Sequence, residues 1–91
     1  MNTQKFDKDK ELEKLLYFVM QKYPELKKYI FSIRYNSLYG AYAMCIIDGR
    51  KVDIEIDLDL KNESETLKIA AIASEISHIV NYPALKGGAC L

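Results

Sequence analysis

Two side chains in one short segment could take part in hydrolytic chemistry: Glu75 and His78, the chain's one histidine. They lie three positions apart in residues 74–78 (SEISH), so a helix would bring both to the same side. Imidazole nitrogen is a good zinc ligand, and a glutamate beside the metal can act as general base on metal-bound water. The segment therefore offers Glu75 as a candidate general base and His78 as a candidate metal ligand.

This segment resembles the H-E-x-x-H helix of zinc metallopeptidases, with Ser74 in place of the first histidine. Over residues 12–82 the chain also resembles the minimal gluzincin-like scaffolds of the zincins, which run helix, meander with a final strand (here KVDIEIDLDL), then active-site helix. The resemblance implies that Glu75 is the base and His78 the second ligand. Serine is a poor zinc ligand, and Cys90 is the one further donor after His78.

A catalytic zinc site needs three protein ligands and an open position. The pattern therefore favours a decayed, non-catalytic zincin-like scaffold, or an amphipathic helix with Glu75 and His78 on its outer face, and we expect no cofactor. The alternative is a minimal zinc-dependent hydrolase or peptidase, in which Cys90 or a second subunit completes the ligand set.

Acidic residues alternate with apolar ones in residues 51–60. Strand geometry would place these carboxylates on one face, about 6.6 Å apart. We weigh three interpretations: a solvated sheet face, a docking surface for a basic partner, and a Ca²⁺ or Mg²⁺ site, although a straight strand cannot wrap six ligands around an ion. The residues concerned are Asp53, Glu55, Asp57 and Asp59.

Tyrosine is unusually frequent, with seven residues in a 91-residue chain. Tyr35, Tyr39 and Tyr42 cluster around the predicted turn SLYGAY. Tyrosine joins an apolar ring to a polar tip, so it suits protein interfaces and the rim of a small core alike. We predict a protein-binding patch at these three residues, with a rim of the core as the alternative.

The elements that position these residues are two helices and three strands. An apolar stripe predicts an N-terminal helix that begins near residue 8, capped by Asp7 or Asp9 and ended by Pro24, which can open a further turn. Residues 30–36, 41–47 and 51–60 read as strands, with Asp48-Gly49 as a hairpin turn. A second helix follows, capped by Asn62 and stopped by Pro83. The predicted packing stripes are Leu12, Leu15, Leu16, Val19 and Tyr23, then Ile69, Ile72, Ala73, Ile76, Ile79 and Val80.

This order predicts an α+β fold: an N-terminal helix, a three-stranded antiparallel meander with residues 41–47 at its centre, and a long second helix packed on the sheet. Residues 1–91 are expected to form one domain, with flexible ends at 1–7 and 84–91.

The amino-acid composition excludes some classes of function. Thirteen basic residues balance thirteen acidic ones, which argues against a nucleic-acid binder and leaves self-association unopposed. The sequence has no apolar run of about 20 residues, so it predicts no membrane-spanning helix. Both cysteines read as free thiols, so we expect a cytoplasmic protein. The favoured function is a small non-catalytic binding protein, a regulator or inhibitor carried by a virus or mobile element, with a protein partner or a homo-oligomer.

Overall fold

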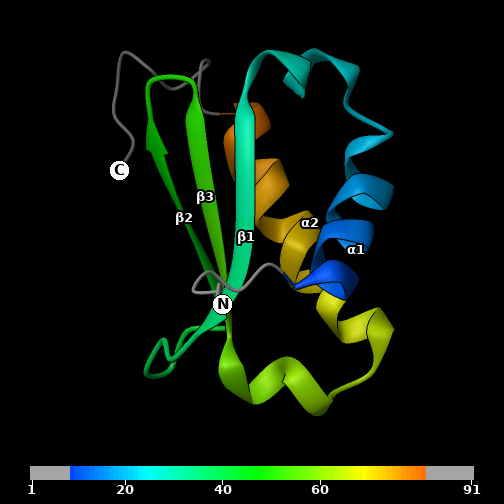
Figure 1. Ribbon diagram of the computed structural model, residues 1–91, viewed down its shortest axis with the longest axis vertical. Coiled ribbons are helices and arrows are strands. Elements are labelled where there is room, and N and C mark those ends of the chain that lie inside the picture. The colour runs from blue at the N-terminus through cyan, green and yellow to red at the C-terminus, as the bar shows by residue number, and fades with distance from the viewer. Residues whose placement is uncertain (1–8, 82–91) are drawn as a thin grey trace, which may run out of the picture.

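The computed structural model describes residues 9–81, which form an α+β domain of two helices and a three-stranded sheet (Figure 1). The predicted flexible ends and Cys90 lie outside this range. The elements in chain order are α1 (Lys10–Met20), a 3₁₀ helix (Pro24–Lys28), β1 (Ile30–Asn36), β2 (Ala43–Asp48), β3 (Lys51–Asp57), a second 3₁₀ helix (Leu58–Asn62) and α2 (Glu65–Asn81).

Helix α1 follows its sequence pattern. Asp9 caps it, since its Oδ1 accepts the Leu12 N–H at 3.0 Å, and Pro24 opens the 3₁₀ turn that follows the helix. Its buried side chains are the predicted Leu12, Leu15, Leu16 and Val19. The predicted cap and these four buried residues are therefore confirmed, whereas the helix ends at Met20 and Tyr23 lies beyond it.

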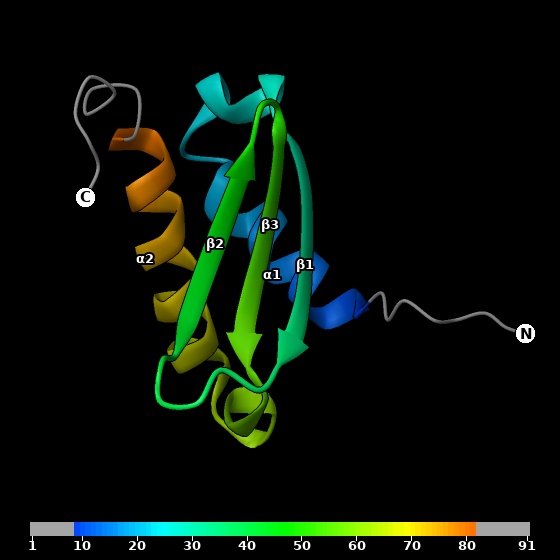
Figure 2. The same cartoon turned by 90° about the vertical axis from the view of Figure 1, so that its left-hand side faces the viewer.

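The predicted antiparallel meander is wrong. The sheet order is β1-β3-β2, with β1 parallel and β2 antiparallel to β3, so the sheet is mixed and β3 is its centre. The connection after β1 carries the chain past the end of β3 to the far side of the sheet, where β2 becomes an edge strand (Figure 2). The run AYAMCII, expected at the centre, alternates instead between half-buried and exposed residues.

Hydrogen bonding across β1 and β3 explains this order. In the parallel register, Ser32 lies beside Asp53, and Arg34 beside Glu55. The donors on β1 thereby meet the carboxylates on β3, whereas Met44 and Ile46, their cross-strand neighbours on β2, are apolar. If β3 paired with β2 alone, the acidic side chains of β3 would lack side-chain donors. In the central position, β3 pairs with β2 on one side and receives donors from β1 on the other.

Two turns fix the strand order. Gly49 and Arg50 join β2 to β3, and φ is +63° at Gly49, as a two-residue hairpin with glycine first requires. The predicted hairpin is thus confirmed, but its turn residues are Gly49 and Arg50 rather than Asp48 and Gly49, because Asp48 belongs to β2 and pairs with Lys51. At the other end, the Asp57 N–H donates to the Tyr42 carbonyl at 2.8 Å, which closes the connection against β3.

Both helices cover one face of the sheet and leave the other, here called the open face, uncovered (Figure 2). Val52, Ile54 and Ile56 of β3 point into the helix layer, where they are fully buried against residues such as Ile72 and Ile76 of α2. The strand ends at Asp57 rather than Leu60, and the cap of α2 is Ser64, whose Oγ accepts the Leu67 N–H at 3.2 Å, not the predicted Asn62.

Candidate functional site

Glu75 and His78 of α2 do not share one outer face of the helix, although the sequence predicted that they would. Glu75 is only 7% exposed and faces the sheet beside Cys45 of β2, whereas the His78 side chain is 68% exposed. His78 Nδ1 lies 3.6 Å from Glu75 Oε1, an ion-pair distance that is too long for a hydrogen bond. The expectation of an outer-face Glu75 is therefore wrong, and the one of an exposed His78 is confirmed.

Cys45, Glu75 and His78 form a row in which the carboxylate stands between the thiol and the imidazole. Burial, and after it the negative charge of Glu75, raise the pKa of the Cys45 thiol to about 11. Nucleophilic cysteines need the opposite, a pKa lowered by an adjacent imidazole that the carboxylate then orients. The order of the row and the direction of the shift both argue against a cysteine nucleophile here.

We therefore predict that Cys45 alkylates slowly. A pKa of about 11, against 9.0 for the unperturbed thiol, leaves about a hundredfold less thiolate at pH 8. Iodoacetamide kinetics on a Cys90→Ser variant should show this deficit relative to the same chain in denaturant. Glu75→Gln should speed the reaction severalfold and the exposed control Glu65→Gln should not. Equal rates in the folded and unfolded chain would refute the protected thiol.

The donors required for a zinc site do not come together in residues 9–81. No group of three or more His, Cys, Asp or Glu side chains in this range is placed to hold a metal ion. Ser74 is exposed on α2 and supplies only a hydroxyl, and Glu75 is turned away toward β2. Residues 9–81 thus do not fit a three-ligand catalytic zinc centre.

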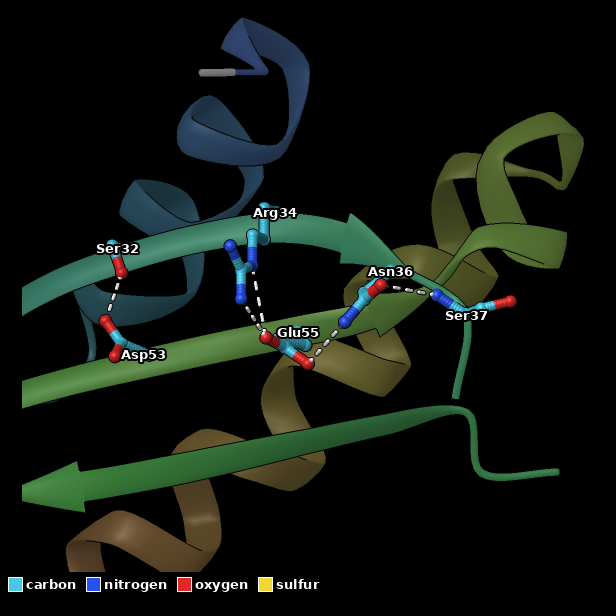
Figure 3. Close-up of polar contacts among 6 residues, drawn as sticks. All are labelled: Ser32, Arg34, Asn36, Ser37, Asp53 and Glu55. Atoms are coloured by element: carbon cyan, nitrogen blue, oxygen red, sulfur yellow. Dashed lines mark hydrogen bonds and ion pairs between the residues drawn. The ribbon is translucent and has the colours of Figure 1, made fainter. Parts of the chain in front are cut away.

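The acidic residues of β3 are bonded within the sheet (Figure 3). Glu55, 5% exposed, accepts from Arg34 Nε at 3.1 Å and Nη2 at 2.5 Å, and from Asn36 Nδ2 at 3.1 Å. These bonds, from Arg34 first, lower the pKa of Glu55. Asp53 accepts a short bond from the Ser32 hydroxyl. Because Glu55 is buried and bonded, it offers little to a docking partner.

Asp57 is the last residue of β3, and Asp59 lies beyond the strand. The Asp57 carboxylate accepts the Leu38 N–H at 2.9 Å and the Asp59 N–H at 3.3 Å, so it ties the β1–β2 connection to the start of the 3₁₀ helix. Asp59 lies in that helix, not on the strand. The predicted row of four carboxylates on one strand is thus wrong at Asp59. The carboxylate of Asp57 caps the 3₁₀ helix.

The predicted tyrosine patch is split between two environments. Tyr35 points into the helix layer, with its hydroxyl buried and Lys61 Nζ 5.6 Å from its ring centroid. Tyr39 and Tyr42 stand on the β1–β2 connection, 92% and 69% exposed. The core-rim interpretation fits Tyr35, whereas the surface interpretation fits Tyr39 and Tyr42.

Sequence reasoning missed Lys68, which is 4% exposed and buried under α1 and β1. Its Nζ donates to Glu11 Oε1 at 3.1 Å, and the Tyr35 hydroxyl lies nearby without a hydrogen bond. Burial alone would lower the pKa of Lys68, but the bond to Glu11 and the neighbouring Tyr35 raise it on balance. One feature of the sequence could have indicated that Lys68 is buried: at helical spacing it lies on the same face as Ile72, Glu75 and Ile79.

Comparison of the chain with protein-family models, with curated proteins and with solved structures finds no match. The resemblance to zincins therefore stays a prediction. Within residues 9–81, neither helix is long and apolar enough to cross a membrane.

Proposed function

We propose that this protein is a non-catalytic binding protein, a regulator or inhibitor, that recognises a protein partner through Tyr39 and Tyr42. The observation that carries the proposal is the state of the β1–β2 connection, residues 37–42. It exposes two large aromatic rings on a backbone that is held in place on both sides. Exposed tyrosines on ordered loops are typical of recognition surfaces, because their rings add contact area at low entropic cost.

Hydrogen bonds organise the connection. Asn36 Oδ1 accepts the Ser37 N–H at 2.9 Å, Asp57 holds the Leu38 N–H, and the Asp57 N–H holds the Tyr42 carbonyl. A loop ordered before binding loses less entropy on association.

Backbone strain supports the same conclusion. Tyr39 has φ +48°, in the left-handed region that costs a non-glycine residue about 1–2 kcal/mol. Its ring meets no core residue that would offset this cost, since it is almost fully exposed. A strained, outward-pointing tyrosine is consistent with selection for binding rather than for stability.

The hydrolase alternative draws less support. Glu75 is buried against β2, and Cys45 has a raised pKa, so neither is placed to act on a bound substrate. His78 is the one exposed member of that row.

Serine substitution of Tyr39 and Tyr42 together tests the proposal. The tagged protein is used for affinity capture from a lysate of its source cell, followed by mass spectrometry. We expect a protein retained by the wild type and lost with the double variant. Tyr17→Ser is the matched control, because Tyr17 is a comparably exposed tyrosine on α1. The double variant should melt close to the wild type, because both rings lie largely in solvent and contribute little to the core. An enriched protein that binds the double variant equally well, or no enriched protein at all, would contradict the proposal.

A further inference from the structure

Strand β2 has an outer edge that carries backbone donors and acceptors. The hairpin pairs Asp48 with Lys51, and the same register continues to Tyr42 and Asp57, whose backbones are bonded. In an antiparallel pair, the backbone groups of successive residues point alternately toward and away from the partner strand. The N–H and C=O groups of the even-numbered residues of β2 therefore bond to β3, and those of the odd-numbered residues point away from β3. The N–H and C=O groups of Ala43, Cys45 and Ile47 therefore face outward, with no backbone partner within residues 9–81.

Helix α2 extends beyond this edge. In Figure 2 its C-terminal half lies outside β2, past the last strand of the sheet. A further strand beside β2 would therefore lie over α2, as β2 and β3 already do. On α2, Ser74 and His78 are exposed, and His78 lies next to the buried Glu75.

Glu75 adds a charge to this edge. Its carboxylate is nine-tenths buried, and within residues 9–81 the one basic group in ion-pair distance is His78, at 3.6 Å. The other polar neighbour of Glu75 is the Cys45 thiol, a weak donor, and a buried carboxylate is costly without a well-placed cation. A lysine or arginine from a segment lying on the β2 edge would supply that cation.

The open face of β2 is apolar beside the same edge. Met44 and Ile46 are partly exposed there, and Tyr42 continues the row at the start of the strand. In an added strand, alternate side chains would cover this row, while the others would face α2. Apolar residues suit the first set, and a basic residue suits the second.

We propose that the outer edge of β2 binds an extended segment of the partner protein as an additional antiparallel strand. The segment has apolar residues over Met44 and Ile46 and a lysine or arginine directed at Glu75. This inference rests on the proposed function and specifies the form of the partner.

A second copy of the chain fits this edge less well. Two β2 strands paired about a two-fold axis would bring the overhanging part of each α2 over the other subunit's sheet, where that subunit's own α2 packs. An isolated extended segment brings no helix layer and avoids this conflict. The occupant is therefore a strand-forming segment of another protein.

A synthetic peptide of the sequence TVTVKVTVT, acetylated and amidated, is the probe, and binding to the full chain is followed by NMR titration. Residues opposite Ala43, Cys45 and Ile47 share their face, so the threonine and lysine N–H groups of the peptide should bond to β2. N-methylation of the peptide's central lysine and of the two threonines nearest to it should weaken binding at least tenfold. N-methylation of the two valines that flank the lysine should leave binding within twofold. No binding at 1 mM, or equal effects of both methylated peptides, overturns the proposal.

The charge is tested by a double substitution. Glu75→Gln should weaken binding of the lysine peptide about tenfold, and that of a peptide with norleucine in place of lysine less than twofold. Glu65→Gln, on the first turn of α2, is the control and should change neither. A Glu75→Gln effect that is the same for both peptides would show that Glu75 acts through the fold rather than through the lysine.

Other occupants give different results. The amides of Ala43, Cys45 and Ile47 should exchange rapidly in the free monomer. If they are protected and the peptide does not compete, residues 82–91 occupy the edge; if sedimentation shows a dimer that the peptide dissociates, a second copy does. Either result overturns the inference. If the peptide fails while capture still depends on Tyr39 and Tyr42, the strand site is wrong and the proposed function stands.

Discussion

Replacement of Arg34 by alanine should destabilise the protein by about 2 kcal/mol, although Arg34 is itself largely exposed. Its guanidinium supplies two of the hydrogen bonds to the buried carboxylate of Glu55 at the centre of the sheet. Without them, Asn36 is the one side-chain donor to Glu55 that remains within residues 9–81. A domain of this length has about 5–10 kcal/mol of total stability, so urea unfolding should show a clear fall in midpoint.

Acid pH and a second substitution identify the cause. Glu55 has a lowered pKa in the folded protein, so its pairing stabilises the fold above the unfolded pKa of about 4.3 and is lost as pH falls through the folded value. The difference between wild type and Arg34→Ala should shrink over that window. Adding Glu55→Leu to Arg34→Ala should restore most of the loss. Ser32→Ala, which removes the exposed bond to Asp53, should cost much less. A loss that is independent of pH and not restored would point to lost packing of Arg34 instead.

The same contacts show why sequence predicted the elements but not their order. Helix and strand periodicity depends on neighbours along the chain, so β1 and the apolar stripe of α1 could be found from pattern alone. Strand order depends on pairs far apart in sequence. Consecutive strands pair more often than not, which favoured the meander. The matched series Ser32-x-Arg34-x-Asn36 and Asp53-x-Glu55-x-Asp57 held the signal for the parallel pairing, but only when donors and acceptors are compared between strands.

The candidate site was harder to predict for a related reason. A glutamate on an amphipathic helix normally points to water, so Glu75 was expected on the outer face, and a lysine such as Lys68 gives no signal of burial by its type. Both are buried beside residues that are distant in sequence. Glu75 lies beside Cys45 on β2, the strand that the wrong sheet order had placed at the centre, and Lys68 lies beside Tyr35 on β1 and Glu11 on α1. The exposure of Tyr39 and Tyr42 could be predicted from the sequence, because turns lie at the surface.

Replacement of Glu11 by alanine should cost about 2 kcal/mol, because it leaves the ammonium of Lys68 buried without a carboxylate. This pair joins α1 to α2, and the buried hydroxyl of Tyr35 places β1 beside it. Glu11 is itself about half exposed, so the cost lies below that of a fully buried pair. Thermal unfolding should show a fall of about 8–16 °C for a domain of this size. Glu13→Ala, on the exposed face of the same helix, is the matched control and should change the melting temperature little.

Alkaline pH and a compensating substitution separate the charge from the packing. Lys68 has a raised pKa when folded, so its pairing stabilises the protein fully below the unfolded pKa of about 10.4 and is lost as pH rises through the folded value. The penalty of Glu11→Ala should therefore persist at pH 7 to 9 and shrink above about pH 10.5. Lys68→Met keeps most of the length of the side chain and removes the charge, so combining it with Glu11→Ala should recover most of the stability. If the double variant stays as unstable as Glu11→Ala, the loss comes from helix packing, and Lys68 is not the charge that Glu11 stabilises.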